Sequence, residues 1–229
     1  MTLIFALLLL MFSCQTTKKK KKAPIYVPQE NCKCISEPKK ISKYAFEVLD
    51  ELNFARTKPK EYAEIINLRR KNFKGKIYKE PGKIDIKTNE GVSALDEAVS
   101  LLRKTKPMPP LTMSGCLILA AQQHVNDIGP RGIVGHYGSD GSAPHDRIEK
   151  YTSCLYSSGE CIAFGSDSPR DVVIDLLIDD GVRDRGHRKL ILDADFIIAG
   201  VATGMHKVYR TTTVIDFSKD NLIGKKFTK

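Results

Sequence analysis

The chain has 229 residues and carries 37 basic and 27 acidic side chains, which gives a net charge of +10. This length fits one domain with appendages, and 41% apolar with 28% charged residues excludes a disordered chain or a bundle of membrane spans. Most of the excess positive charge lies in residues 1–40, so the rest of the chain is only mildly basic. A nucleic-acid-binding domain carries such an excess on its own surface, and we therefore expect no nucleic-acid partner.

The first segment, residues 2–12, is almost wholly apolar. It is shorter than the roughly 20 residues that a membrane-spanning helix needs, and it matches the apolar region of a secretory signal. We therefore predict a signal peptide over residues 1–14. Ser13 and Cys14 resemble a lipoprotein cleavage site, so lipidation of Cys14 and ordinary signal cleavage both stay open. Either alternative predicts a secreted, extracellular or cell-envelope protein, and a lipidated Cys14 would hold it at a membrane surface.

Residues 15–40 are rich in lysine, threonine and proline, which predicts a charged linker or arm. The lysines of residues 18–22 repel one another and favour an extended chain. The pattern becomes helical at Ile41. We place one folded domain over residues 41–218 and a C-terminal tail over residues 219–229.

The remaining cysteines agree with export, because an oxidising compartment permits disulfides. Cys154 and Cys161 flank a Ser-Ser-Gly turn and are predicted to form a local bridge. Cys116 is then expected to pair with Cys34 or Cys32, which would tie the arm to the domain and leave one thiol over. The alternative for the Cys-x-Cys pair is a metal clip, but no second pair of ligands stands at the spacing of a zinc finger.

Helical periodicity and helix-start signals dominate the first half of the domain. Helices are predicted to begin, in chain order, near Ile41, Pro59, Asn89, Ser114, Ser142 and Ser168, with a further short helix over residues 186–192. Residues 70–88 are rich in lysine and glycine and predict a loop.

Strands follow the helices rather than alternating with them. They are predicted over residues 159–164, 196–202 and 208–217, with a hairpin turn at 203–207 between the last two. Helices followed by a hairpin, without strand–helix–strand units, indicate an α+β fold in which helices pack on an antiparallel sheet.

Two histidines lie beside glycines in turn or cap contexts, namely His136 and His187, and Glu160 lies between them near a strand start. Two imidazoles and a carboxylate suit a divalent transition metal of the zinc type. Their spacing carries no local metal signature, so unrelated surface histidines remain the alternative.

Three motifs in order resemble the CAP superfamily, which contains the cysteine-rich secretory proteins, antigen 5 and the plant pathogenesis-related proteins. They are G-H-Y-G-S-D-G-S (135–142), G-E-C-I-A-F-G (159–165) and R-G-H-R-K-L-I-L (185–192), the last followed by I-A-G-V-A. The helical opening V-L-D-E-L-N-F-A-R (48–56) matches as well. The chain resembles most the bacterial and protist branch of SCP-like extracellular proteins, over residues 41–218. The resemblance implies an α-β-α sandwich with a central, mainly antiparallel sheet.

The resemblance also implies a central cleft with two histidines and two acids, which binds a divalent cation in some members. By motif, His136, Glu160 and His187 take three of these places. The family usually has a glutamate as its second acid. This chain offers aspartates at 175, 179 and 180 instead, of which we take Asp179 as the candidate ligand. Cys161 stands where the family usually has asparagine, and the chain has no tryptophan.

Four further side chains are considered for roles at or near the cleft. His124 and Arg188 are candidates for ligand binding, although a hydrogen-bonded, partly buried His124 and a solvated Arg188 are the simpler interpretations. His145 and His206 are expected at the surface.

The sequence lacks a G-x-S-x-G motif and has no cysteine in a protease context. We therefore expect a non-catalytic, exported CAP-domain protein whose cleft binds a divalent metal of the zinc type. A lipid or protein ligand, as in some relatives, is a further expected partner. The alternative is a metal-assisted hydrolase that uses the same cleft.

Overall fold

The structure is a computed structural model that describes residues 32–166, 168–222, 224–225 and 227. The predicted signal peptide, Cys14 and the lysine run of residues 18–22 lie outside the described residues. Within the described part, no helix has both the length and the apolar character needed to cross a bilayer.

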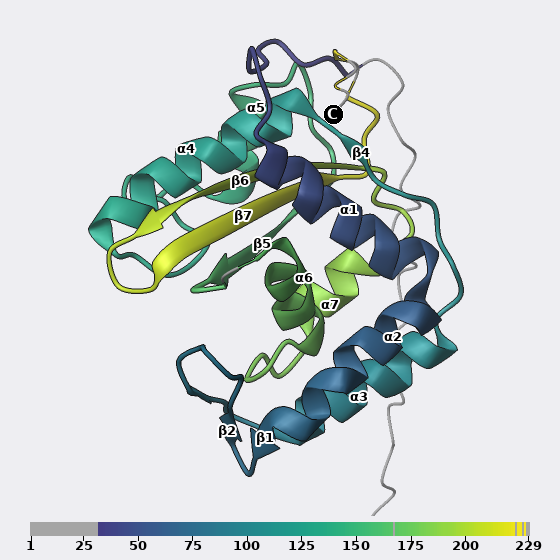
Figure 1. The fold of residues 1–229 in the computed structure, drawn as a ribbon. Helices are drawn as coiled ribbons and strands as arrows, with labels where there is room; N and C mark the ends of the chain where they lie inside the picture. Colours follow the sequence, from purple (N-terminus) through teal and green to yellow (C-terminus); the bar gives the residue numbers. More distant parts are fainter. Residues whose placement is uncertain (1–31, 167, 223, 226, 228–229) are drawn as a thin grey trace, which may run out of the picture.

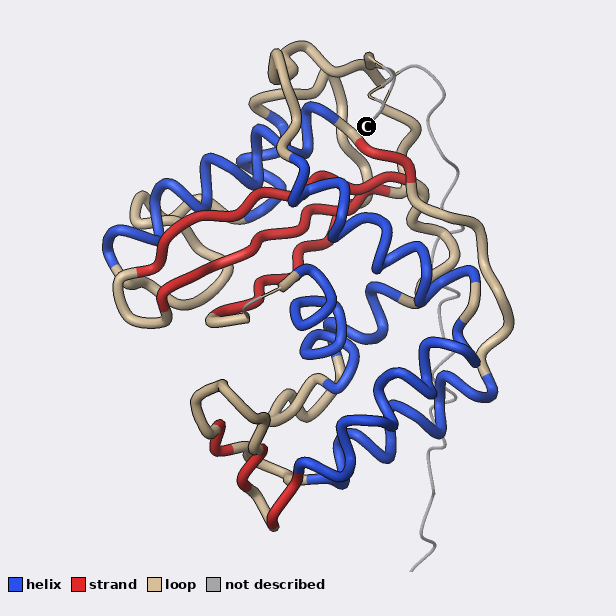
Figure 2. Tube along the Cα trace, in the orientation of Figure 1, coloured by secondary structure: helices blue, strands red, loops and turns tan. Residues whose placement is uncertain are grey.

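A four-stranded sheet forms the centre of the domain (Figures 1 and 2). In spatial order, its strands are β4 (Thr112–Met113), β6 (Ile198–His206), β7 (Arg210–Ser218) and β5 (Ser158–Phe164). Strands β6 and β7 form an antiparallel hairpin, β5 pairs antiparallel with β7, and β4 runs parallel to β6. Strand β5 therefore lies at one edge of this sheet.

Helices cover both faces of the sheet (Figure 1). The helices are α1 (Lys43–Thr57), α2 (Pro59–Asn67), the 3-10 helix η1 (Leu68–Asn72), α3 (Val92–Lys104), α4 (Gly115–Arg131), α5 (Pro144–Glu149), α6 (Pro169–Ile178) and α7 (Gly186–Ile191). Helices α4 and α5 lie on one face, and α1, α6 and α7 lie on the other. The predicted α+β class and its α-β-α sandwich are confirmed.

Helix α4 approaches strand β6 closely at Gly200. A Cβ atom at this position would overlap the backbone of Leu117 and Ile118, so a glycine is required for the contact. The close approach buries the apolar face of α4 against the sheet.

Helices α2 and α3 pack side by side, and the chain between them forms a second, smaller antiparallel sheet (Figure 1). Its strands are β1 (Phe73–Lys74), β2 (Ile77–Tyr78) and β3 (Ile86–Lys87). The prediction of a loop over residues 70–88 is therefore wrong. Strands of two residues are too short to show an alternating pattern, and the turn between β1 and β2 is made by Gly75 at a φ of 60°.

Arg56 links helix α1 to the segment that follows α7. Its fully buried guanidinium donates hydrogen bonds to the backbone carbonyls of Pro109, Ile191, Asp193 and Phe196. Because the guanidinium satisfies carbonyls that would otherwise be buried without a partner, Arg56 fixes the end of α7 against the core.

Two disulfides fasten the N-terminal arm to the domain, Cys32–Cys154 and Cys34–Cys116. The second is the predicted pairing. The predicted Cys154–Cys161 bridge is wrong, because Cys161 lies on β5 with its thiol buried and free. The arm instead pairs with the segment before β5 through Ile35 N–H to Tyr151 O and Ser153 N–H to Lys33 O. Within the segment predicted as linker, Cys32 is buried and Cys34 is bridged to α4, and Asp220 and Leu222 of the predicted tail are buried as well.

Loss of either bridge should destabilise the domain. The bridges close loops of 122 and 82 residues, and removing such a native disulfide typically costs about 2–5 kcal/mol of unfolding free energy. We expect Cys34→Ser/Cys116→Ser and Cys32→Ser/Cys154→Ser each to lower the denaturant midpoint, whereas Cys161→Ala changes it less. Peptide mapping should recover both bridges. Cys161 should react with an alkylating reagent only after the protein is unfolded, and a Cys154–Cys161 peptide would contradict the assignment.

Candidate functional site

The predicted site residues come from opposite layers of the sandwich and meet at the edge strand β5. His136 lies in the loop between α4 and α5, Glu160 lies on β5, Asp179 ends α6 and His187 lies in the first turn of α7. The ring centroids of His136 and His187 are 6.4 Å apart. The structure therefore brings together the two imidazoles of the predicted cleft.

The first half of the cleft is built on a buried ion pair. Glu160 Oε1 accepts a hydrogen bond from His136 Nδ1 at 2.8 Å, and Glu160 Oε2 accepts one from Arg147 at 2.7 Å. The side chains of Glu160 and Arg147 are each 1% exposed. Arg147 also donates to the backbone carbonyls of Ser142 and His136, so it holds the loop that carries the imidazole at two points.

The second half is built on the turn after α6. Asp179 adopts a left-handed conformation, with φ at 58°, and its buried carboxylate accepts a hydrogen bond from His187 Nδ1 at 2.7 Å. Its other oxygen accepts the backbone N–H of Arg188. Of the three candidate aspartates, Asp179 is therefore the one at the cleft: Asp175 contacts Arg69 and Ser166, and Asp180 accepts the N–H groups of Asn89 and Glu90.

Both imidazoles reach solvent from these buried supports. The side chain of His136 is 46% exposed and that of His187 is 23% exposed. A neutral imidazole that donates from Nδ1 keeps its lone pair on Nε2, and neither Nε2 has a hydrogen-bond partner among the described residues. In its neutral form, each ring therefore presents an Nε2 lone pair.

The predicted set of four metal ligands differs from this arrangement. Glu160 and Asp179 bond the Nδ1 atoms behind the imidazoles, and the described residues contain no group of three or more side chains placed to hold one metal ion. Carboxylates behind ligating histidines orient the rings and raise their basicity. The chemistry of the donors thus fits a metal site of two imidazoles whose other positions belong to water or to a ligand.

His124 supports the cleft rather than lining it. The ring is fully buried and its Nε2 bonds the carbonyl oxygen of Gly135, the residue before His136. Burial lowers the pKa of His124, which favours the neutral ring. The predicted hydrogen-bonded role is found, and a direct role in binding a ligand is excluded by the burial.

Arg188 and His206 require corrections. Arg188, predicted as a ligand-binding residue, is buried and donates to Glu97 and to the backbone carbonyls of Leu177 and Ile178. It ties α6 to α3 and does not reach the cleft surface. His206, predicted at the surface, is 2% exposed: its Nδ1 accepts the N–H of Val208 and its Nε2 bonds Ile133 O. The turn around His206 folds back onto the end of α4, which hides the ring.

Sequence reasoning missed Asp216, which lies opposite Glu160 in the β5–β7 ladder. Asp216 is fully buried, and burial together with the neighbouring Glu160 raises the pKa of its carboxyl well above the usual range. A lone acid within the apolar pattern of residues 214–217 was the available signal. The raised pKa favours the neutral form of Asp216, which avoids a second negative charge beside Glu160.

Removing one partner of the buried ion pair should be costly. We expect Arg147→Met to leave Glu160 buried without its cation and to lower the unfolding free energy by about 3–5 kcal/mol. The matched control is Arg103→Met, because Arg103 pairs with Glu64 at 2.8 Å with both side chains at least half exposed. Chemical denaturation should show little change in the control, and equal losses in the two variants would contradict the structural role of Arg147.

The buried His124 should make stability depend on pH. Its folded-state pKa lies below the unfolded value of about 6.5, so below that pH the unfolded chain binds more protons and the folded state loses stability. Asp127 and Glu160 raise the pKa of His124 and Arg147 lowers it, and none of them reverses the effect of burial. We expect His124→Gln to flatten the fall in unfolding free energy between neutral pH and about pH 5. The exposed His145→Gln should keep the wild-type slope; an unchanged slope in His124→Gln would refute the prediction.

Known proteins resemble the chain in sequence and in structure. The model of the cysteine-rich secretory protein family (CAP) matches residues 97–217. Similar solved structures include an outer surface protein from Borrelia burgdorferi, with 20% identity, a TM-score of 0.43 and coverage of 50% of this chain and 80% of that one. An extracellular SCP-domain protein from Bacillus anthracis has 22% identity and a TM-score of 0.40, with 48% of this chain and 34% of that one covered.

A third similar structure, BmVAL-1, has 12% identity and a TM-score of 0.37, with 85% of each chain covered. No curated protein matches the chain.

Proposed function

Because the chain belongs to the cysteine-rich secretory protein (CAP) family, we propose that it is an exported, non-catalytic protein whose two-histidine cleft binds a divalent metal ion of the zinc type. One observation carries the proposal: two partly exposed imidazoles lie with their ring centroids 6.4 Å apart, each held at Nδ1 by a buried carboxylate. His136 and His187 would hold the ion through Nε2. A bound ion would supply positive charge to a lipid or protein ligand that binds over the cleft.

Within this cleft, the roles of the chain's own residues follow from their contacts. Glu160 and Asp179 keep each Nδ1 protonated and each ring in place. Arg147 holds the His136 loop, and the N–H of Arg188 holds Asp179. Two protein ligands are fewer than the three or four of most zinc sites, so we expect modest affinity.

Export is supported by two separate features. They are the apolar segment over residues 2–12 and the two disulfides, which need an oxidising compartment. Detergent partitioning of the exported product, with mass spectrometry of its N-terminus, separates a lipidated Cys14 from ordinary signal cleavage.

Calorimetric titration with Zn²⁺ tests the cleft. We expect saturable binding by the wild type, loss of binding in His136→Ala/His187→Ala, and a loss of about 10–100-fold in affinity in Glu160→Gln and in Asp179→Asn. The control His145→Ala removes a histidine whose side chain is 62% exposed and lies outside the cleft, and it should bind as the wild type does.

The titration also separates the proposal from its alternative. Binding without turnover in a broad screen of ester, amide and phosphoester substrates supports the non-catalytic function. Metal-dependent turnover that disappears in His136→Ala/His187→Ala would replace it with the hydrolase. Unchanged Zn²⁺ affinity in that double variant would remove the metal site altogether.

A further inference from the structure

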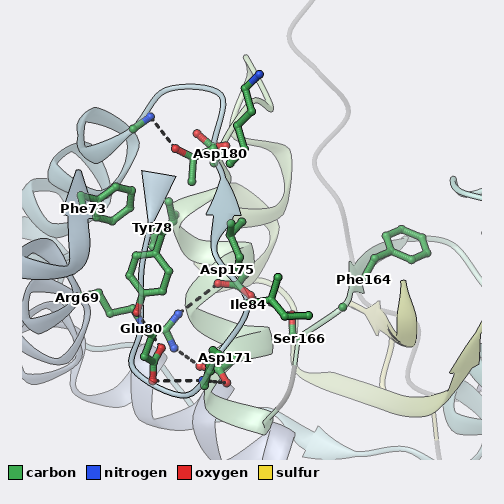
Figure 3. Close-up of a pocket in the computed structure, with 17 residues that line it drawn as sticks. Arg69, Phe73, Tyr78, Glu80, Ile84, Phe164, Ser166, Asp171, Asp175 and Asp180 are labelled. Atoms are coloured by element: carbon green, nitrogen blue, oxygen red, sulfur yellow. Dashed lines mark hydrogen bonds and ion pairs between the residues drawn. The ribbon is translucent and has the colours of Figure 1, made fainter. Parts of the chain in front are cut away.

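A second concave site lies between the small β1–β3 sheet and helix α6 (Figure 3). It has a volume of about 280 Å³, and none of its lining residues belongs to the histidine cleft. Such a volume suits a small molecule rather than a macromolecule.

The walls of this cavity expose apolar side chains to water. Ile84 is 72% exposed and Ile86 is 54% exposed, and both line the cavity together with Phe73, Phe164 and Ile178. Figure 3 shows Ile84 beside Asp175 and Ser166. Large apolar side chains that stay exposed in a concave site favour a ligand with an apolar part.

Charged side chains in the cavity do not balance. Arg69 pairs with Asp171 and Asp175, and Lys83 pairs with Asp171 and Glu80, so two cations serve three carboxylates. The complete lining adds Lys87 and Asp180 and stays one negative charge in excess. This excess is complementary to a ligand with one positive charge.

Asp175 is a carboxylate of the cavity that stays accessible beside its one cationic partner, Arg69. Its oxygens lie 3.3 Å from Arg69 and 2.9 Å from the hydroxyl of Ser166, and its side chain remains 49% exposed within the cavity. The surrounding protein raises its pKa to about 6 despite Arg69, because desolvation disfavours the charged form. A cation that enters the cavity would meet an accessible carboxylate in a lining with one excess negative charge.

We propose that this cavity binds a small organic cation, a primary ammonium group on an apolar chain or ring. The ammonium group bonds Asp175, and the apolar part covers Ile84 and Ile86. The β1–β3 segment supplies the apolar wall and α6 supplies the carboxylate.

Calorimetric titration of the full domain with hexylamine at pH 7.5, alongside hexanoate and hexanol, tests the charge selectivity. We expect saturable binding of hexylamine and much weaker binding of the other two, which share its chain length but not its charge. Hexanoate or hexanol binding as tightly as hexylamine, or no binding of hexylamine in the millimolar range, would overturn the proposal.

Variants locate the binding. Asp175→Asn should weaken hexylamine by about tenfold or more, and Ile84→Ser, which alters an exposed side chain, should weaken it separately. The matched controls are Asp195→Asn, which removes an exposed carboxylate paired with Lys219, and Val208→Ser, which removes an exposed apolar side chain outside the cavity. Both should bind hexylamine as the wild type does. Equal affinity in Asp175→Asn and wild type, with melting curves that show both folded, would refute the site.

The histidine cleft serves as the last control. His136→Ala/His187→Ala should retain the full hexylamine affinity, whatever its behaviour toward Zn²⁺. Loss of hexylamine binding in this variant would assign the amine to the histidine cleft and overturn the proposal, without bearing on the metal site.

Discussion

The buried ion pair between Arg147 and Glu160 is the interaction on which the cleft depends. Both side chains are almost completely removed from water, and such a pair is tolerated when further hydrogen bonds satisfy its remaining donors and acceptors. Arg147 uses two backbone carbonyls for this purpose, and Glu160 uses His136 Nδ1. The hydrogen bonds run from Arg147 through Glu160 to His136 Nδ1, so the buried pair orients the imidazole and turns its Nε2 outward. Arg147 Nε stays buried without a partner among the described residues.

His187, the other imidazole, is also positioned by a buried carboxylate that bonds its Nδ1, in this case Asp179. Asp179 is buried at the end of α6 and bonds both His187 Nδ1 and the N–H of Arg188. Arg56 bonds the last carbonyl of α7, at Ile191, and Arg188, within α7, bonds the last carbonyl of α6, at Ile178. Three buried arginines, at 56, 147 and 188, therefore determine how two layers of the sandwich meet at the edge of the sheet. None of them is exposed to a ligand, which is why the prediction of a ligand-binding Arg188 was wrong.

The long amphipathic helices and the strands β5, β6 and β7 were predictable because their apolar spacing repeats over several turns or residues. The small β1–β3 sheet was not predictable, since strands of two residues carry no period.

Family motifs placed His136, Glu160 and His187 together. The choice of Asp179, in contrast, depended on a left-handed backbone turn that a run of aspartates does not reveal. The predicted Cys154–Cys161 bridge failed for a similar reason: the two cysteines are close in sequence, but Cys161 lies on β5 with its thiol in the core. His206 was predicted at the surface because it lies near a hairpin turn. This turn packs on α4, so the ring is buried.

The free thiol of Cys161 has a consequence for how the two disulfides form. Burial and the nearby carboxylates of Asp179, Glu160 and Asp216 raise the pKa of this thiol, so the nucleophilic thiolate needed for disulfide exchange is suppressed once β5 has docked. Before docking, the same cysteine can compete for Cys154 on the basis of sequence proximity alone. Correct disulfide formation therefore depends on β5 docking into the sheet before Cys161 is oxidised. If β5 docks slowly, Cys161 can form a wrong disulfide with Cys154.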